Sequence, residues 1–88
     1  MASYDIGAPT NVTATGIIKA MQGSLIGFYV NSTSSGTLIL YDAATAVTTT
    51  PISGTIPPAI GFHRFPAGLS TGLYVVIAST LNVTFFTA

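Results

Sequence analysis

Side chains that could carry acid–base or nucleophilic chemistry are few in this sequence. Apart from hydroxyl residues they are Asp5, Asp42 and His63, with Lys19 and Arg64 as the cations, and there is no cysteine and no glutamate. General acid–base catalysis needs two titratable groups held together, or one group in a strongly perturbing environment. Asp5 and Asp42 stand 37 positions apart, and neither has a histidine near it in the sequence. The sequence therefore predicts a protein that is not an enzyme.

The His63-Arg64 pair is the most distinctive part of this inventory. Serines are abundant, so a Ser–His–acid triad is formally available, but no nucleophile-elbow motif singles out one serine. Consecutive residues of a strand face opposite sides, so we expect one of the pair to pack inward and the other outward. Arg64 could then make a forked contact with a carboxylate or carbonyl on a neighbouring chain. Both residues are candidates for a structural or interface role, with ligand binding as the alternative.

Metal and phosphate sites lack their usual ligands. With no cysteine and a single histidine, thiolate and imidazole sites have too few donors. The Gly68–Gly72 segment has no lysine and precedes an expected strand rather than a helix, so it is not a P-loop. We therefore expect no metal, no cofactor and no catalytic residue. Asp42, at the end of an expected strand, is assigned to hydrogen bonds with the backbone of the turn that follows it.

Charge is scarce along the whole chain. Charged residues make up 5% of the 88 residues, against about 25% in a typical soluble domain, whereas the apolar fraction of 49% is ordinary. Centres of protein interfaces are depleted in Lys, Glu and Asp, so the composition favours a surface that other subunits cover. A hydroxyl-rich, well-hydrated exterior is the alternative. The sequence has no basic stripe for nucleic acid and no apolar run near the roughly 20 residues of a membrane helix.

Strands are the elements that must position these side chains. Val, Ile, Thr, Tyr and Phe come in short runs bounded by Gly, Pro, Ser and Asn, and no window shows helical apolar spacing. The sequence predicts an all-β fold, a small antiparallel β-sandwich or jelly roll of seven to eight short strands, over residues 10–88. Residues 1–9 are expected to form an N-terminal arm that becomes ordered on binding. They contain neither a basic segment nor an apolar run, so no signal peptide is expected.

Two hairpins are expected within this domain. One would join residues 25–31 to 37–42, and the other residues 72–78 to 81–87. The two share five identities over 17 aligned positions, which either a duplication or common hairpin composition would explain. The other expected elements are a first strand at 11–21 interrupted at Gly16, a weak edge strand at 46–50, a strand at 60–65 and a turn at 66–68.

Bulky residues occupy consecutive strand positions, as in Phe28-Tyr29 and Phe85-Phe86. Such pairs place large apolar groups on both faces of a sheet, where a solitary two-layer domain shows polar residues outside. Aromatic residues dominate contacts between subunits, so we interpret the second face as an interface. The alternative is that tyrosine hydroxyls lie at the rim and a loop covers this face. The candidate interface residues are Tyr29, Tyr41, His63, Arg64, Tyr74 and Phe86.

Three stretches of the chain resemble small β-domain proteins from the structural modules of tailed bacteriophages. They are GFYVNSTSSGTLILYDA (residues 27–43), GFHRFPA (61–67) and STGLYVVIASTLNVTFF (70–86). The resemblance is to capsid decoration (cement) proteins and to accessory domains of tails or fibres. It implies a β-sandwich or jelly-roll subunit without a cofactor, present in many copies and frequently trimeric.

The expected function is therefore that of a non-enzymatic virion structural protein, a decoration subunit that binds and stabilises a capsid lattice. Its partners would be the major capsid protein or other virion subunits and copies of itself, with no nucleic acid and no membrane. We expect synthesis in the host cytoplasm and a final location on the capsid surface. The alternative is a carbohydrate- or receptor-binding module of a phage tail or fibre, with Tyr4, Asn31 and Asp42 as sugar contacts.

Overall fold

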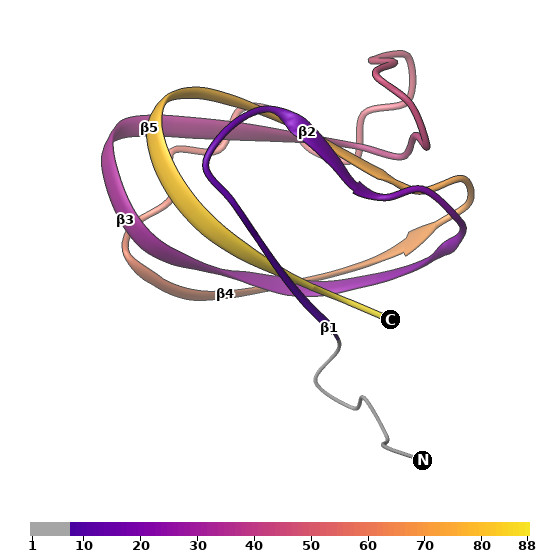
Figure 1. The fold of residues 1–88 in the computed structure, drawn as a ribbon, viewed down its shortest axis with the longest axis horizontal. Coiled ribbons are helices and arrows are strands. Elements are labelled where there is room, and N and C mark those ends of the chain that lie inside the picture. Colours follow the sequence, from indigo (N-terminus) through magenta and orange to yellow (C-terminus); the bar gives the residue numbers. More distant parts are fainter. Residues whose placement is uncertain (1–7) are drawn as a thin grey trace.

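The computed structural model describes residues 8–88, whose regular secondary structure consists entirely of β-strands. The strands form one antiparallel sheet of five strands in the order β1-β5-β3-β4, and β2 also pairs with β5 (Figure 1). The prediction of an all-β, antiparallel fold is confirmed. The strand bounds are β1 (Ala8–Val12), β2 (Gly16–Lys19), β3 (Gly23–Tyr41), β4 (Gly61–Leu69) and β5 (Leu73–Thr87).

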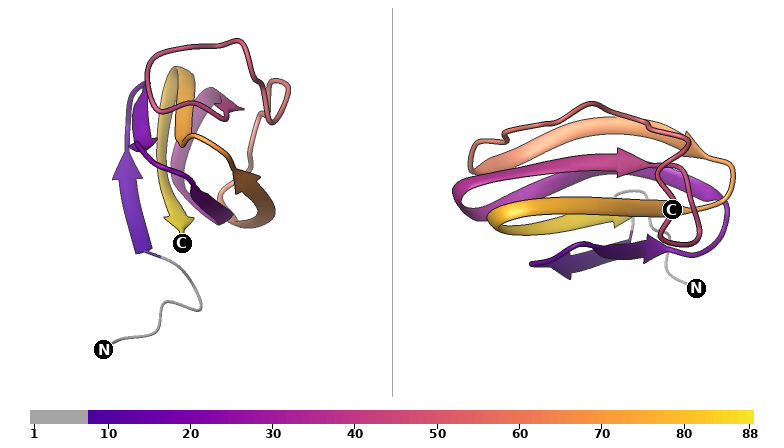
Figure 2. Two further views of the ribbon diagram at one scale, coloured as in Figure 1. Left: turned by 90° about the vertical axis from the view of Figure 1, so that its right-hand side faces the viewer. Right: turned by 90° about the horizontal axis from the view of Figure 1, so that it is seen from above.

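The two long strands, β3 and β5, run side by side from the Leu25–Thr87 pair to the Tyr41–Tyr74 pair. Both bend midway, and Ser35 and Ser79 take left-handed φ angles of 58° and 61° at these bends. The sheet consequently curves back until its two halves face each other (Figure 2). One half contains β1, β4, residues 23–30 of β3 and residues 81–87 of β5. The other half contains β2, residues 37–41 of β3 and residues 73–77 of β5.

The two hairpins expected from the sequence do not form. Each expected hairpin is a single continuous strand, and the two strands pair with each other instead of folding onto themselves. The small residues between the expected arms are accommodated by register shifts in the bent ladder. Gly36 is needed for the close approach of β5, because an added Cβ would lie 2.8 Å from Cβ of Leu81. The five strands are therefore fewer and longer than the seven to eight that the sequence predicts.

The middle of the chain differs from expectation in two places. Residues 66–68 do not turn but continue β4, which tolerates Pro66 because β4 is an edge strand bonded only to β3. Residues 46–50 form no strand, and the segment before β4 touches the sheet through isolated bridges at Pro51 and Ile56. The expected interruption of the first strand is present, but it lies at residues 13–15, and Gly16 begins β2.

A single apolar core fills the space between the two halves of the sheet. Phe28 and Phe85 are its largest side chains, with ring centroids 5.7 Å apart. The predicted arm lies outside the described residues except for Ala8 and Pro9, which begin β1. The described part of the chain has no helix that could cross a membrane. The fully buried core side chains are Leu25, Phe28, Val30, Leu38, Leu40, Leu73, Val75, Leu81, Val83 and Phe85.

Candidate functional site: an exposed aromatic face

The half of the sheet that contains β1 and β4 carries aromatic side chains on its outer side. In β3, Phe28 is buried whereas its neighbour Tyr29 is 42% exposed; Phe62 of β4 is 53% exposed. Phe86 of β5 is half-buried and follows the buried Phe85. Alternation along the strands thus places Tyr29, Phe62 and Phe86 on the same outer side, and we call these three residues the aromatic face.

Register and one glycine bring the three aromatic residues together. Tyr29 is paired with Phe62 across β3 and β4, and Phe86 is paired with Gly27 across β5 and β3. Because Gly27 has no side chain, the rings of Phe62 and Phe86 meet across β3 with centroids 6.0 Å apart and planes at 64°. A Cβ on Gly27 would lie 3.1 Å from the tip of the Phe62 ring. The absence of a side chain at Gly27 therefore leaves the space in which Phe62 and Phe86 make contact.

Three asparagines from three strands form a hydrogen-bonded row next to the aromatic face. Nδ2 of Asn11 donates to Oδ1 of Asn82 at 2.8 Å and to Oγ1 of Thr84 at 3.0 Å. Nδ2 of Asn31 donates to the same two acceptors, at 3.2 and 3.0 Å. Thr84 is also the cross-strand partner of Tyr29, so this amide row adjoins the aromatic face. It supplies oriented polar groups at the border of an apolar surface.

The His63-Arg64 pair divides between the two sides of β4, as the sequence predicts. His63 points inward: its ring lies 5.2 Å from that of Phe28, and Nε2 donates to the carbonyl oxygen of Ala59 at 2.7 Å. Arg64 is exposed on the outer side, beside Gly27. The histidine is therefore a packing residue at the core, and only the arginine of the pair reaches the aromatic face.

The opposite half of the sheet carries Tyr41 and Tyr74. Tyr41 and Tyr74 are cross-strand partners whose ring centroids lie 6.1 Å apart. Both are half-buried, and each has a further neighbour, Pro51 beside Tyr41 and Ile17 beside Tyr74. We call the Tyr41–Tyr74 pair and its surroundings the tyrosine face; it lies on the other outer side of the folded sheet.

Asp42 holds the end of β3 to the turn that precedes β5. Its carboxylate accepts hydrogen bonds from the backbone N–H groups of Thr71 (2.9 Å), Ser70 (2.9 Å) and Gly72 (3.3 Å), and from the Thr71 hydroxyl (3.0 Å). These bonds, led by the Thr71 N–H, lower the pKa of Asp42 from 3.8 to about 2 against an opposing effect of desolvation. The predicted role as a backbone acceptor holds, but the turn is not the one that follows Asp42 in the chain.

The structure thus separates the six residues that the sequence nominated. Arg64 joins Tyr29 and Phe86 on one surface, Tyr41 and Tyr74 lie on the other, and His63 belongs to the interior. Phe62, the most exposed aromatic of the aromatic face, was not nominated. The alternation of side chains along a strand could have identified Phe62, because it lies two residues before Arg64 in the same strand and shares its outward side.

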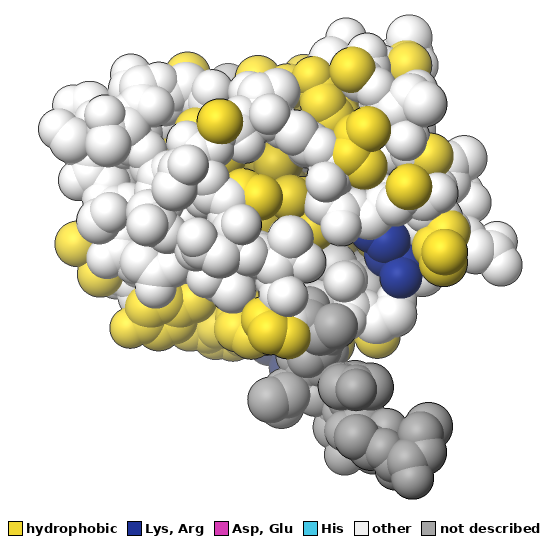
Figure 3. All heavy atoms as spheres, in the orientation of Figure 1, with side chains coloured by type: hydrophobic (Ala, Val, Ile, Leu, Met, Phe, Trp, Pro, Cys, Tyr) yellow, Lys and Arg dark blue, Asp and Glu magenta, His cyan; other side chains and the backbone are white. Residues whose placement is uncertain are grey.

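The surface formed by the described residues offers little charge and no cluster suited to a metal. Figure 3 shows hydrophobic side chains along the lower margin, where β4 and the first half of β3 lie in Figure 1, and dark blue cations in few places. Within residues 8–88, no three His, Asp or Glu side chains lie close enough to hold a metal ion.

Comparisons of the chain with protein-family models, with curated proteins and with solved structures found no match.

Proposed function

We propose that this protein is a non-enzymatic structural subunit that binds a larger protein assembly through the aromatic face. The observation that carries the proposal is the exposure of Tyr29 (42%) and Phe62 (53%) on adjacent strands, with Ile60, 64% exposed, just before β4. Contiguous exposed apolar side chains on a small domain are typical of protein interaction sites. Aromatic residues contribute most to such contacts because they bury a large area with few rotatable bonds.

The assembly we propose is a virion, with the protein as a decoration or cement subunit on a capsid lattice. The support is the resemblance of three sequence stretches to structural modules of tailed phages, together with the low charge of the surface. The partner would be the major capsid protein, and several copies would act together, since many modest contacts add up when geometry allows them to engage at once.

We also infer that the folded sheet is a β-sandwich, with its two halves as the two layers. The bends divide β3 and β5 into two segments each, which with β1, β2 and β4 gives seven segments in two facing layers. The core between the layers supports this description, because side chains of both halves contribute to it. A sandwich keeps the aromatic face rigid, which lowers the entropic cost of docking.

The test compares the wild-type chain with Tyr29→Ser/Phe62→Ser in two assays. One is light scattering across a concentration series, and the other is co-sedimentation with undecorated capsids of tailed phages. The matched control is Ile17→Ser/Val47→Ser, which removes two hydrophobic side chains of comparable exposure (45% and 42%) away from the aromatic face. We expect co-sedimentation with capsids to be lost in the first variant and kept in the control, while light scattering checks that both variants keep the solution mass of the wild-type chain. Equal behaviour of the two variants would overturn the proposal.

A second candidate function is recognition of carbohydrate on a tail or fibre. The observation that favours it is the amide row beside Tyr29, since an exposed ring next to oriented amides suits a sugar's apolar face and its hydroxyl groups. A glycan array decides between the two functions. Binding that is lost in both Tyr29→Ala and Asn82→Ala would favour the carbohydrate module over the structural subunit.

A further inference from the structure

Arg64 lies next to the aromatic face, on the same outer side of the sheet. It is the cross-strand partner of Gly27, whose other partner is Phe86, so the row across β5, β3 and β4 reads Phe86, Gly27, Arg64. Phe62 precedes it by two residues on the same side of β4. A Cβ on Gly27 would lie 3.2 Å from Cα of Arg64 and 3.1 Å from the Phe62 ring. The guanidinium side chain and the two rings thus share one surface.

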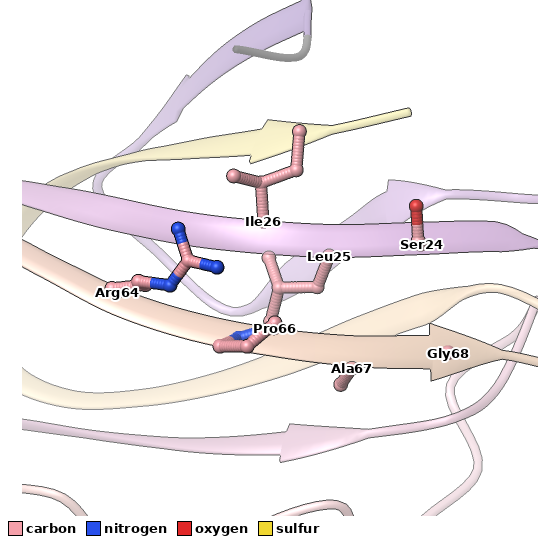
Figure 4. A pocket seen from close by; sticks show the side chains of 7 residues that line it. All are labelled: Ser24, Leu25, Ile26, Arg64, Pro66, Ala67 and Gly68. Atoms are coloured by element: carbon pink, nitrogen blue, oxygen red, sulfur yellow. The ribbon is translucent and has the colours of Figure 1, made fainter. Parts of the chain in front are cut away.

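An open hollow of about 500 Å³ adjoins the Arg64 side chain. Figure 4 shows Arg64 extending from β4 towards Ile26 of β3, with Pro66 beyond it on the same strand. The hollow lies at the register shift between Leu25 and Gly27, where the β3–β4 ladder is interrupted. Its lining residues are Ser24, Leu25, Ile26, Arg64, Pro66, Ala67 and Gly68.

A partner that covers the aromatic face must also remove water from Arg64. Burial of a guanidinium without a counter-charge is strongly unfavourable, whereas a carboxylate meets its fork of N–H donors with two parallel hydrogen bonds. Asp42 is the only carboxylate side chain in residues 8–88, and it already accepts four hydrogen bonds from the turn at residues 70–72. Within residues 8–88, the single carboxylate side chain of a second copy is therefore already engaged in its own chain.

We infer that the aromatic face binds an acidic segment of a different protein, whose carboxylate pairs with Arg64 and whose neighbouring apolar side chain packs on Phe62 and Phe86. This inference rests on the proposed function and adds the chemistry of its partner. The arginine selects partners, because a segment with an apolar residue but no acid would leave the guanidinium desolvated and unpaired.

The test uses 3-phenylpropionate as the probe, because its carboxylate suits Arg64 and its ring suits Phe62, with sodium chloride at equal ionic strength as the control. Binding to the full isotope-labelled chain is followed by NMR at the Nε–H of Arg64 and at the Phe62 ring. We expect saturable shifts at both positions and binding about tenfold weaker in Arg64→Gln, with an intermediate loss in Arg64→Lys, which keeps the charge without the fork. Lys19→Gln, which removes the other cation, should bind as the wild type does.

Two results would overturn the inference. One is a probe response that does not saturate, or that is equal in Arg64→Gln and the wild type. The other is a self-assembled oligomer that dissociates equally in Arg64→Gln and Asp5→Asn, since a second copy would then supply the carboxylate. A third combination separates the two proposals. If Tyr29→Ser/Phe62→Ser abolishes capsid binding while 3-phenylpropionate binds the wild type and Arg64→Gln equally, the proposed function is supported and the inference of an acidic partner is overturned.

Discussion

The aromatic face and the tyrosine face lie on opposite outer sides of one folded sheet and arise from the same sequence pattern. In both, a buried residue is followed or preceded by an outward aromatic one, as in Phe28-Tyr29 and Leu40-Tyr41. Yet Tyr29 and Phe62 are 42% and 53% exposed, whereas Tyr41 and Tyr74 are half-buried. The identical pattern therefore produces two surfaces with different consequences.

The neighbours of each pair explain the difference. Tyr41 and Tyr74 are flanked on both sides, by Pro51 from the middle segment and by Ile17 from β2. Phe62 lies on the edge strand β4, which pairs only with β3. We conclude that the tyrosine face stabilises the fold, because its rings are flanked by their own chain on both sides, while the aromatic face stays more exposed and ends at the edge of the sheet.

Gly27→Ala is expected to have the largest effect on stability, because Gly27 lies between Phe62 and Phe86, where the two rings make contact. The new Cβ would lie 2.5 Å from the carbonyl oxygen of His63, a backbone atom that cannot swing away, and it would separate the rings of Phe62 and Phe86. We expect a loss of about 1–3 kcal/mol in the free energy of unfolding, measured by urea denaturation. Gly68→Ala is the matched control on β4, where an added Cβ meets no atom within 4 Å; an equal loss there would refute the steric explanation.

Exchanging one aromatic residue on each face tests the comparison directly. Tyr74→Ala removes a half-buried ring and its contact with Tyr41, so we expect a loss of about 1–2 kcal/mol. Phe62→Ala removes a more exposed ring, and we expect a loss of about 0.5 kcal/mol in stability together with loss of partner binding. Denaturation midpoints and co-sedimentation of both variants provide the measurements. A larger stability loss in Phe62→Ala than in Tyr74→Ala would reverse the assigned roles.

Asp42→Asn tests the contact that fixes the tyrosine face to the turn before β5. Because the folded pKa of Asp42 is lowered from 3.8 to about 2, its contribution is complete well above pH 3.8 and is lost as the pH falls through about 2. At pH 7 we expect the variant to lose about 1 kcal/mol, since three N–H donors exchange a charged acceptor for a neutral one.

Thermal unfolding of both chains between pH 2 and pH 7 provides the measurement for Asp42. The gap between wild type and Asp42→Asn should narrow as the pH approaches 2. Thr71→Val, which removes only the hydroxyl donor, should show a smaller loss with the same direction of pH dependence. A gap that stays constant with pH would mean that the charge of Asp42 does not stabilise the turn.

Asn82→Ala is expected to have the smallest effect. The variant removes the oxygen that accepts from both Asn11 and Asn31, but these exposed amides can bond to water instead. We expect a loss of about 0.5 kcal/mol or less in the denaturation experiment, with capsid binding unchanged. A stability loss comparable to that of Tyr74→Ala would show that the amide row belongs to the structural part of the molecule.

The sequence by itself determined the fold class and the alternation of neighbouring side chains within a strand. Short β-branched and aromatic runs without helical periodicity predict antiparallel strands, and the period of two predicts that Phe28 and Tyr29, and likewise Phe85 and Phe86, face opposite sides. The same alternation predicts the opposite directions of His63 and Arg64. These features are local, because they depend only on neighbours along one strand.

Tertiary structure decided which strands pair and which outward residues meet. A run such as Ser32–Gly36 suits either a hairpin loop or a bulged bend, and only the alternative partner, β5, selects the bend. Strand pairing likewise placed Phe62 beside Phe86, left Tyr41 and Tyr74 on the other face, and directed Asp42 to a turn that lies 28 to 30 residues further along the chain. Contacts between distant segments depend on register, and register is set by the whole packed sheet rather than by the residues on either side of each position.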